Sequence, residues 1–277
     1  FPYTTLFRSP QLSFLVRNSQ WLSDDEMQTF ANKEIHEGGL GEISWFAGER
    51  PIVGWIGQEF NVRGQTKIIL RRRQRENLII VGDYNEARFG MLTGLLASFA
   101  LMASPKQNQF HIIDKTIPGA PWNTALRDLK DELLDPIGCE INYAVKSAEA
   151  ESVFSRLMEV LKSRLQTEED DRLKFGNIYL CIADPDKLEA LCQIPNKYGN
   201  MEDSKLGLNL QEIYIKGPSV GIFTILAVES VMSFFNIISK RNLDYFRHRV
   251  ALQMSEDDSF TIVKRREASN HQLEWKK

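Results

Sequence analysis

Residues 78–93 read LIIVGDYNEARFGMLT, in which four apolar residues run to Gly82 and a turn-like stretch leads into an apolar helix. A buried strand that bends at a glycine into a helix is how a phosphate-binding loop begins, although it is also an ordinary turn. The pattern G-x-x-x-x-G-K-[ST] requires Gly, Lys and Ser or Thr where this chain has Ala87, Arg88 and Phe89. The stretch therefore predicts the backbone of a nucleotide site without its usual side chains.

The composition is that of a globular chain, with 277 residues, 43% hydrophobic and 26% charged residues and a net charge of −3. This length allows one large domain or two smaller ones. The slightly acidic balance argues against wholesale wrapping by nucleic acid, although local basic patches remain possible. Cys139, Cys181 and Cys192 form no C-x-x-C pair, which indicates reduced thiols and a cytoplasmic location. No apolar run is long enough to span a membrane, although a longer parent protein could be membrane-associated.

The ends of the chain predict a fragment of a longer protein. Residues 1–9, FPYTTLFRS, have no helix or strand period and look like a translated sequencing adapter, so they are excluded from the fold. Residues 10–60 are expected to form an N-terminal linker and a β-rich edge. Within them, Ser23 and Glu26 predict a capped helix. Residues 61–277 are expected to form the main domain, cut short at its C-terminus.

Buried strands alternate with helices along the main domain. Apolar stretches between glycines in residues 43–70 predict β-hairpins at its edge. Strands are expected at residues 77–81, 110–113, 178–183, 221–227 and 250–254, and helices at 88–103, 148–166 and 208–216. This alternation predicts an α/β fold with a mostly parallel central sheet flanked by helices. Ligands of such sheets bind beyond the carboxyl ends of the strands, which here are Gly82, Asp114, Asp184 and Glu229.

The order of these segments resembles the FtsK/SpoIIIE family of DNA-translocating ATPases over about residues 50–266. WIGQEF and NLIIVG are similar to the approach to its phosphate loop, and FHIIDK and LMEVLKSRLQ are similar to its next strand and helix. IYIKGPSVGIFTILAVES and FRHRVALQMSEDDS are similar to its last conserved segments. The resemblance implies a RecA-like P-loop NTPase fold that binds ATP and Mg²⁺. It also implies assembly with other ATPase domains of the same chain or as a homo-hexamer, and DNA as a cargo.

The resemblance places the nucleotide contacts in the loop and at two strand ends, at Gly82, Asp83, Glu86, Ala87, Arg88, Phe89, Asp114 and Glu229. Several of these residues oppose the usual chemistry. Ala87 restricts a backbone that glycine leaves free, and Arg88 offers a planar fork instead of a compact ammonium group. Phe89 has no oxygen for Mg²⁺, while Asp83 and Glu86 add negative charge where a polyphosphate would lie.

The strand YLCIADPD ends in Asp184, which is the candidate catalytic and metal-binding residue. ATPases of this type use one carboxylate for Mg²⁺ and a second group that orients the attacking water. If Asp184 is the metal-binding acid, Pro185 holds the position of the group that orients water; if Asp184 orients the water, Ala183 holds the position of the metal-binding acid. Either way, one carboxylate is present where two are needed. Glu229 replaces the Gln that the resemblance implies at the γ-phosphate. We therefore expect ATP and Mg²⁺ binding to be weak or lost, and the domain to be inactive by itself.

A basic run at residues 70–76, LRRRQRE, contains Arg71, Arg72, Arg73 and Arg75, which could contact a nucleic-acid backbone. A solvated face or a subunit interface is the alternative interpretation.

Three functions remain open from the sequence. The first is a degenerate ATPase domain of a larger translocase, with an assembly, regulatory or partner-docking role. The second is a divergent but active motor in which Arg88 replaces the lysine, Asp114 or Asp186 completes the metal site, and a neighbouring subunit supplies what is missing. The third is an interaction module that binds a protein partner in an apolar pocket around Phe89.

Overall fold

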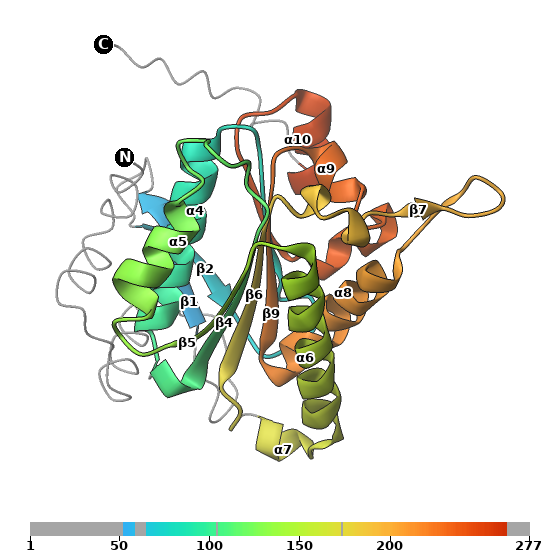
Figure 1. Ribbon diagram of the computed structural model, residues 1–277. Helices are drawn as coiled ribbons and strands as arrows, with labels where there is room; N and C mark the ends of the chain where they lie inside the picture. Colours follow the sequence, from blue (N-terminus) through green and yellow to red (C-terminus); the bar gives the residue numbers. More distant parts are fainter. Residues whose placement is uncertain (1–51, 59–64, 104, 173, 265–277) are drawn as a thin grey trace, which may run out of the picture.

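The computed structural model describes residues 52–58, 65–103, 105–172 and 174–264 (Figure 1). The predicted adapter segment and the helix expected after Ser23 lie outside these ranges. Within them the chain forms a three-layer α/β unit, with helices on both faces of a central sheet (Figure 1). This arrangement confirms the fold class predicted from the alternation of strands and helices.

Six parallel strands form the central sheet, in the order β10-β3-β9-β6-β4-β5. Their bounds are β3 (Leu78–Val81), β4 (Asn108–Asp114), β5 (Glu140–Ala144), β6 (Asn177–Ala183), β9 (Ile222–Val228) and β10 (His248–Ala251). All residues of β3 and β9 are buried. Strands covered on both faces read as continuous apolar runs, which is why the sequence located the central ones.

Helices and short turns connect these strands. The α-helices are α4 (Asn85–Leu101), α5 (Ala125–Leu129), α6 (Ser147–Gln166), α7 (Glu169–Arg172), α8 (Lys205–Lys216), α9 (Val231–Phe235) and α10 (Glu256–Val263). A π-helical turn, η2 (Lys130–Leu134), continues α5. The 3₁₀ turns are η1 (Pro105–Gln107), η3 (Pro185–Lys187), η4 (Glu189–Leu191), η5 (Gly217–Val220) and η6 (Lys240–Tyr245). No helix in the described ranges is long and apolar enough to cross a membrane.

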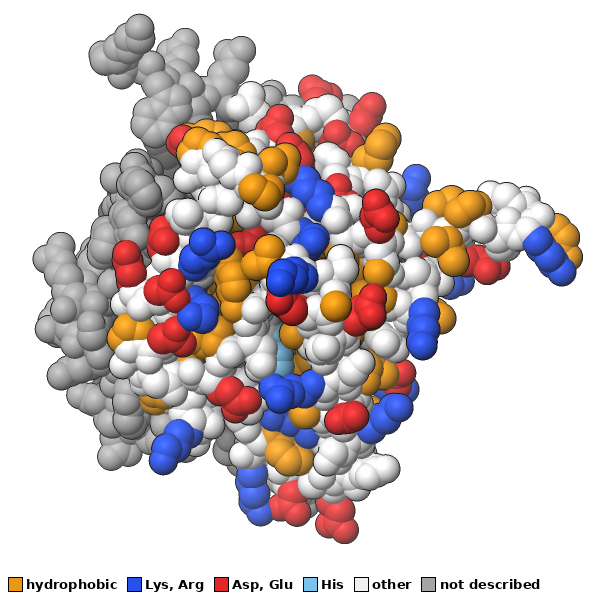
Figure 2. All heavy atoms as spheres, in the orientation of Figure 1, with side chains coloured by type: hydrophobic (Ala, Val, Ile, Leu, Met, Phe, Trp, Pro, Cys, Tyr) orange, Lys and Arg blue, Asp and Glu red, His pale blue; other side chains and the backbone are white. Residues whose placement is uncertain are grey.

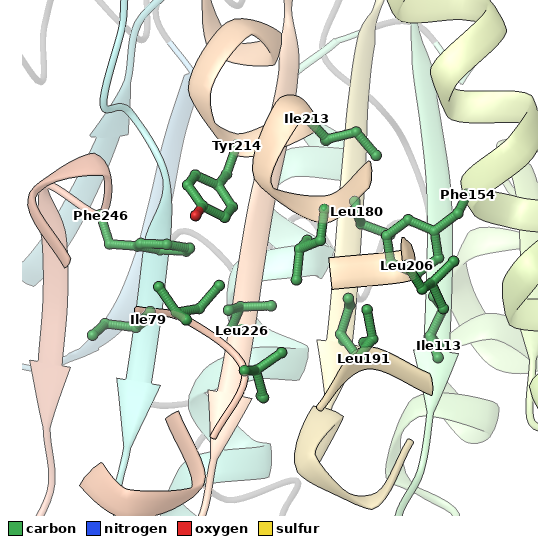
Figure 3. Close-up of a cluster of buried hydrophobic side chains, with 14 of the residues drawn as sticks. Ile79, Ile113, Phe154, Leu180, Leu191, Leu206, Ile213, Tyr214, Leu226 and Phe246 are labelled. Carbon is green, nitrogen blue, oxygen red and sulfur yellow. The ribbon is translucent and has the colours of Figure 1, made fainter. Parts of the chain in front are cut away.

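The core consists of two main clusters separated by the sheet. Ile79 of β3 joins Phe154 of α6 and Tyr214 of α8 on one face (Figure 3). Ile80, the next residue of β3, joins Phe89 of α4 on the other face. Successive side chains of a strand point to opposite faces, so one apolar run supplies both clusters.

Several predicted boundaries differ from the structure. The helix expected to begin at Arg88 begins at Asn85, and the strand expected at Val250 begins at His248. The sequence did not predict β5, because this edge strand buries only Ala144 and its residues EINYA contain no continuous apolar run. Edge strands expose more of their length and therefore carry a weaker sequence signal.

An antiparallel hairpin of β1 (Ile52–Gln58) and β2 (Gln65–Leu70) agrees with the hairpins expected at the domain edge. It spans the predicted boundary at residue 60 and contacts α4. The backbone N–H of Trp55 donates a hydrogen bond to Ser98 Oγ at 3.3 Å. A Cβ atom at Gly54 would lie only 2.5 Å from Leu95 Cδ2. The glycine therefore allows the backbone of β1 to pack closely against α4.

We expect Gly54→Ala to lower the free energy of unfolding by about 1–3 kcal/mol, the usual cost of overpacking a core. Gly94→Ala is the matched control, because its Cβ would meet its nearest neighbour, Trp55 O, at 3.6 Å. Alanine also favours a helix over glycine by about 1 kcal/mol. Urea denaturation of both variants measures the difference, and equal midpoints would contradict the proposed contact between hairpin and helix.

A second hairpin, β7 (Ile194–Pro195) with β8 (Met201–Glu202), was not predicted from the sequence. It projects away from the three layers on the side of α8 (Figure 1). Its strands have two residues each, too few for a recognisable apolar alternation.

Candidate functional site

The strand ends predicted to hold a ligand lie along one edge of the sheet. Gly82 N–H donates to Val228 O at 3.0 Å, and Asp184 N–H donates to Ala227 O at 2.9 Å. These bonds hold the ends of β3, β9 and β6 side by side. We call this edge, with the loops that follow the strands, the carboxyl edge.

The segment between β3 and α4 is short. Gly82 has φ +149°, and a Cβ atom there would lie 2.5 Å from Leu252 Cβ, so the position requires glycine. The helix begins at Asn85, and Arg88 N–H donates to Tyr84 O at 3.0 Å. In a phosphate loop, backbone N–H groups of this stretch surround the ligand. Here the N–H of Arg88 closes the first turn of α4 instead, and Glu86 and Ala87 are helical.

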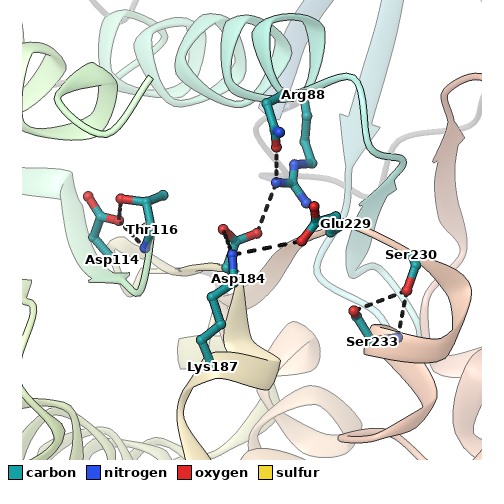
Figure 4. Close-up of polar contacts among 9 residues, drawn as sticks. Arg88, Asp114, Thr116, Asp184, Lys187, Glu229, Ser230 and Ser233 are labelled. Carbon is teal, nitrogen blue, oxygen red and sulfur yellow. Dashed lines mark hydrogen bonds and ion pairs between the residues drawn. The ribbon is translucent and has the colours of Figure 1, made fainter. Parts of the chain in front are cut away.

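A buried ion pair occupies the centre of the carboxyl edge. Arg88 Nη2 lies 3.0 Å from Asp184 Oδ1, and each side chain is 1% exposed. Arg88 also donates a hydrogen bond to Asn85 Oδ1. On the other side of the carboxylate, Lys187 Nζ lies 2.8 Å from Asp184 Oδ2 and 3.8 Å from Glu229 Oε2 (Figure 4). Two cations of the chain therefore neutralise the acid that was predicted to bind Mg²⁺.

Burial and neighbouring charge act against each other in this pair. Burial lowers the pKa of Arg88, and Asp184 and Glu229 oppose that shift. Burial raises the pKa of Asp184, and Arg88 and Lys187 oppose that rise. Because charges are poorly solvated in a protein interior, each partner offsets part of the cost of burying the other.

Asp114 has a different role from the one predicted. Its Oδ1 accepts hydrogen bonds from Thr116 N at 3.0 Å and Thr116 Oγ1 at 2.6 Å, and its Oδ2 accepts one from Tyr143 Oη at 2.5 Å. Figure 4 draws Asp114 with Thr116 apart from the Arg88–Asp184 pair. These bonds stabilise the turn after β4. Asp186, the other candidate for completing a metal site, has a buried Oδ1 without a hydrogen-bond partner among the described residues.

Phe89 is fully buried in the core between α4 and the sheet. Its ring lies 5.3 Å from the guanidinium carbon of Arg88. The apolar pocket that the interaction hypothesis predicted around Phe89 is therefore filled by the chain's own core.

The residues present at the carboxyl edge fit ATP and Mg²⁺ poorly. The position predicted for a metal-binding hydroxyl holds a core phenylalanine, Phe89, and the acid predicted to bind the metal, Asp184, is paired with Arg88. Within the described ranges, no three His, Cys, Asp or Glu side chains are grouped so that they could hold a metal ion. The cations at the site are instead Arg88 and Lys187.

The basic run before β3 lies at the opposite, amino edge of the sheet. Some of its arginine side chains are buried or hydrogen-bonded within the fold. Arg71 is buried, and Arg72 donates to Phe175 O and to Asn177 Oδ1. Arg73 Nε lies 3.2 Å from Oε1 of the buried Glu76, while the Arg75 side chain is exposed. The surface available to a polyanion is thus narrower than the sequence suggested.

Two cations that pair with buried carboxylates were not identified from the sequence. Lys187 follows Asp184 by three residues, so the 3₁₀ turn between them brings the two side chains together, and this spacing is visible in the sequence. Arg247 Nη1 lies 2.8 Å from Glu76 Oε1, so the segment before β10 contacts the end of the basic run at residues 70–76. Only the parallel pairing of β10 with β3 brings them together.

No known family model and no curated protein matches the sequence. Solved structures do match. The cytoplasmic domain of the Thermomonospora curvata type VII secretion ATPase EccC is 14% identical with a TM-score of 0.54, over 74% of this chain and 24% of that one. EccC ATPases 2 and 3 in complex with a signal sequence peptide are 15% identical with a TM-score of 0.51, over 74% of this chain and 36% of that one. The pCW3 conjugation coupling protein TcpA, in its monomer form with ATPγS, is 14% identical with a TM-score of 0.54, over 79% of this chain and 59% of that one.

These similarities, together with the six parallel strands, define a RecA-like P-loop ATPase fold. More particularly, the chain has the fold of the FtsK/SpoIIIE-type ATPase domains, in agreement with the order of segments in its sequence. It spans less than two thirds of the length of each of these structures.

Proposed function

We propose that this domain is a nucleotide-independent ATPase-fold domain of a larger translocase, in which it serves assembly, regulation or partner docking. The observation that carries the proposal is the buried Arg88–Asp184 ion pair. It places the chain's own charges between the start of α4 and the end of β6, where the sequence predicted phosphate and metal contacts.

Nucleotide binding would have to break this pair. Removing one partner of a buried ion pair typically costs about 3–5 kcal/mol, because the other charge is left buried and uncompensated. Each 1.4 kcal/mol corresponds to a tenfold change in affinity, so the pair weakens Mg²⁺-ATP binding on the order of a hundred- to a few thousandfold. The acidic side chains of Asp83 and Glu229 add further repulsion to a polyphosphate.

The comparisons support a larger parent protein, since the three structures named above are longer than this chain. One of them contains ATPases 2 and 3 of EccC together, so domains of this fold occur in tandem there. We infer that this domain acts beside other ATPase domains. Arg73, Arg75 and Arg247 at the amino edge are its candidate contacts to a DNA cargo.

The proposal predicts no saturable binding of a fluorescent ATP analogue, with or without Mg²⁺, at concentrations up to millimolar. Fluorescence titration of the full 277-residue chain measures this, with circular dichroism to show that the protein is folded. Asp184→Asn is the companion variant, because it removes a charge of the pair and keeps the shape of the side chain. Saturable Mg²⁺-dependent binding that Asp184→Asn abolishes would overturn the proposal.

One observation favours the second candidate, a divergent and active motor. Arg88 Nε and Nη1 are buried and have no hydrogen-bond acceptor among the described residues. If Arg88 turned away from Asp184, its guanidinium nitrogens could donate to phosphate oxygens. The same titration separates the candidates, since the active motor requires binding that Arg88→Lys preserves and Arg88→Met removes.

A further inference from the structure

The hairpin β7–β8 with its turn, residues 194–202, forms an arm that carries exposed apolar side chains. Ile194 is 54% exposed, Tyr198 75% and Met201 57%. Figure 2 shows this arm standing clear of the body, with apolar side chains along it and a cationic one near its tip. Apolar groups gathered on a projecting element mark an interaction surface more often than scattered single residues do.

Hydrogen bonds hold the arm in one shape. Asn196 Oδ1 accepts from Tyr198 N at 2.8 Å and from Asn200 N at 3.0 Å, and Asn196 Nδ2 donates to Glu202 Oε1 at 2.7 Å. At the base, Gln193 Nε2 donates to Asp203 Oδ1 at 2.7 Å. The tip is thus presented in a fixed shape, which lowers the entropy lost when a partner binds.

The arm exposes apolar groups on both of its faces. Ile194 pairs with Glu202, and Pro195 pairs with Met201. Side chains of directly opposed residues share a face, and successive residues alternate, so Ile194 and Met201 point to opposite faces. A two-stranded ribbon is marginally stable alone in water. Insertion between two walls would bury both faces, whereas lying flat on a surface would bury only one.

The cation at the tip of the arm identifies the surface that fits it, because the arm's carboxylate, Glu202, lies at the base and accepts a hydrogen bond from Asn196 Nδ2. Lys197 Nζ lies over the ring of Tyr198, 4.8 Å from its centroid, and forms no ion pair with a described residue. The carboxyl edge has the opposite character. The carboxylates that act on Arg88 are Asp83, Asp184, Asp186 and Glu229, against two cations, Arg88 and Lys187.

Apolar groups are also exposed beside this acidic edge. Tyr84 follows β3 and Met232 lies in the first turn of α9, which follows β9; both side chains are exposed. A cation beside an aromatic ring on the arm therefore matches carboxylates beside exposed apolar side chains on the edge. Arg88 pairs with Asp184, and Lys187 lies near both Asp184 and Glu229. Four carboxylates still exceed these two cations, so a lysine from outside can meet the excess negative charge near Asp83 and Glu229.

We propose that the arm of one copy of this chain inserts at the carboxyl edge of a second copy, with Lys197 against Asp83 and Glu229 and Tyr198 between Tyr84 and Met232. The inference rests on the proposed function, because it requires a carboxyl edge free of nucleotide. Arm and edge are different surfaces, so two copies can exchange arms in a closed dimer, or each copy can engage the next in a ring or filament.

Sedimentation velocity of the full chain over a concentration series tests the association. Tyr198→Ser is expected to weaken it on the order of thirtyfold, as for an aromatic anchor at the centre of an interface. Lys197→Glu is expected to weaken it as well, and Glu229→Lys in the second copy to restore it. Leu208→Ser and Lys216→Glu, on exposed positions of α8, are the matched controls and should leave it unchanged.

A carbodiimide that joins lysines to carboxylates locates the contact. In a mixture of ¹⁵N-labelled and unlabelled chains, cross-links from Lys197 to Asp83, Glu86 or Glu229 should join a labelled to an unlabelled peptide. Monomers at every concentration, association that the arm variants leave intact, or cross-links of Lys197 only within one chain would each overturn the inference. If the chain stays monomeric and also binds no nucleotide, the inference fails and the proposed function stands. Nucleotide binding would remove the proposed function itself.

Discussion

Arg88→Met is expected to lower the free energy of unfolding by about 3–5 kcal/mol. The substitution leaves the carboxylate of Asp184 buried, with only Lys187 as a charged partner in the structure. A buried carboxylate that keeps only a partly exposed partner is more costly than an apolar pair of similar volume, so the loss should exceed that of most single substitutions. Urea denaturation followed by circular dichroism measures the change.

The double variant Arg88→Met, Asp184→Leu provides the decisive comparison, because it removes both charges together. It should recover most of the stability lost in the single variant, and the coupling energy from the double-mutant cycle should be large. Lys187→Met is the control; since the Lys187 side chain is 28% exposed, its loss should cost about 1 kcal/mol or less. A single Arg88→Met variant as stable as the Lys187→Met control would contradict the description of the pair as the centre of the site.

Asn77→Ala is expected to destabilise the fold by about 3 kcal/mol or more, because it leaves several buried polar groups without partners. The Asn77 side chain is fully buried just before β3. Its Nδ2 donates to Tyr214 O at 2.7 Å and to Tyr245 O at 2.9 Å, and its Oδ1 accepts from Thr224 N at 3.0 Å. One side chain thus connects α8, η6 and β9.

Two further variants check this interpretation by thermal and urea denaturation. Asn77→Asp keeps the acceptor for Thr224 N but loses both donors, so it should also destabilise the fold strongly. Asn142→Ala, on the edge strand β5, loses one exposed hydrogen bond that Asn142 Oδ1 accepts from Arg156 Nη1, and it should cost about 0.5 kcal/mol. Similar losses for Asn77→Ala and Asn142→Ala would show that the buried network contributes little.

The sequence predicted those elements whose signal is local. The strands β3, β6 and β9 were located because each is a continuous apolar run, and α6 because its apolar residues recur at helical spacing. The edge strand β5 and the β7–β8 arm were missed, since exposed short strands carry little apolar pattern. Four carboxyl-edge positions were predicted correctly as strand ends, although Asp114 proved to be engaged in its own turn.

The sequence by itself determined the layered α/β fold and the side chains that stand in place of a phosphate loop. Both follow from local information, because burial on two faces requires apolar runs and a motif requires fixed spacing. Only the tertiary structure decided what Arg88 does. From the sequence it was a possible substitute for a phosphate-binding lysine, whereas in the fold it turns inward to Asp184. That choice depends on how α4 and β6 meet and on the low solvation between them, which bring together charges that the sequence keeps far apart.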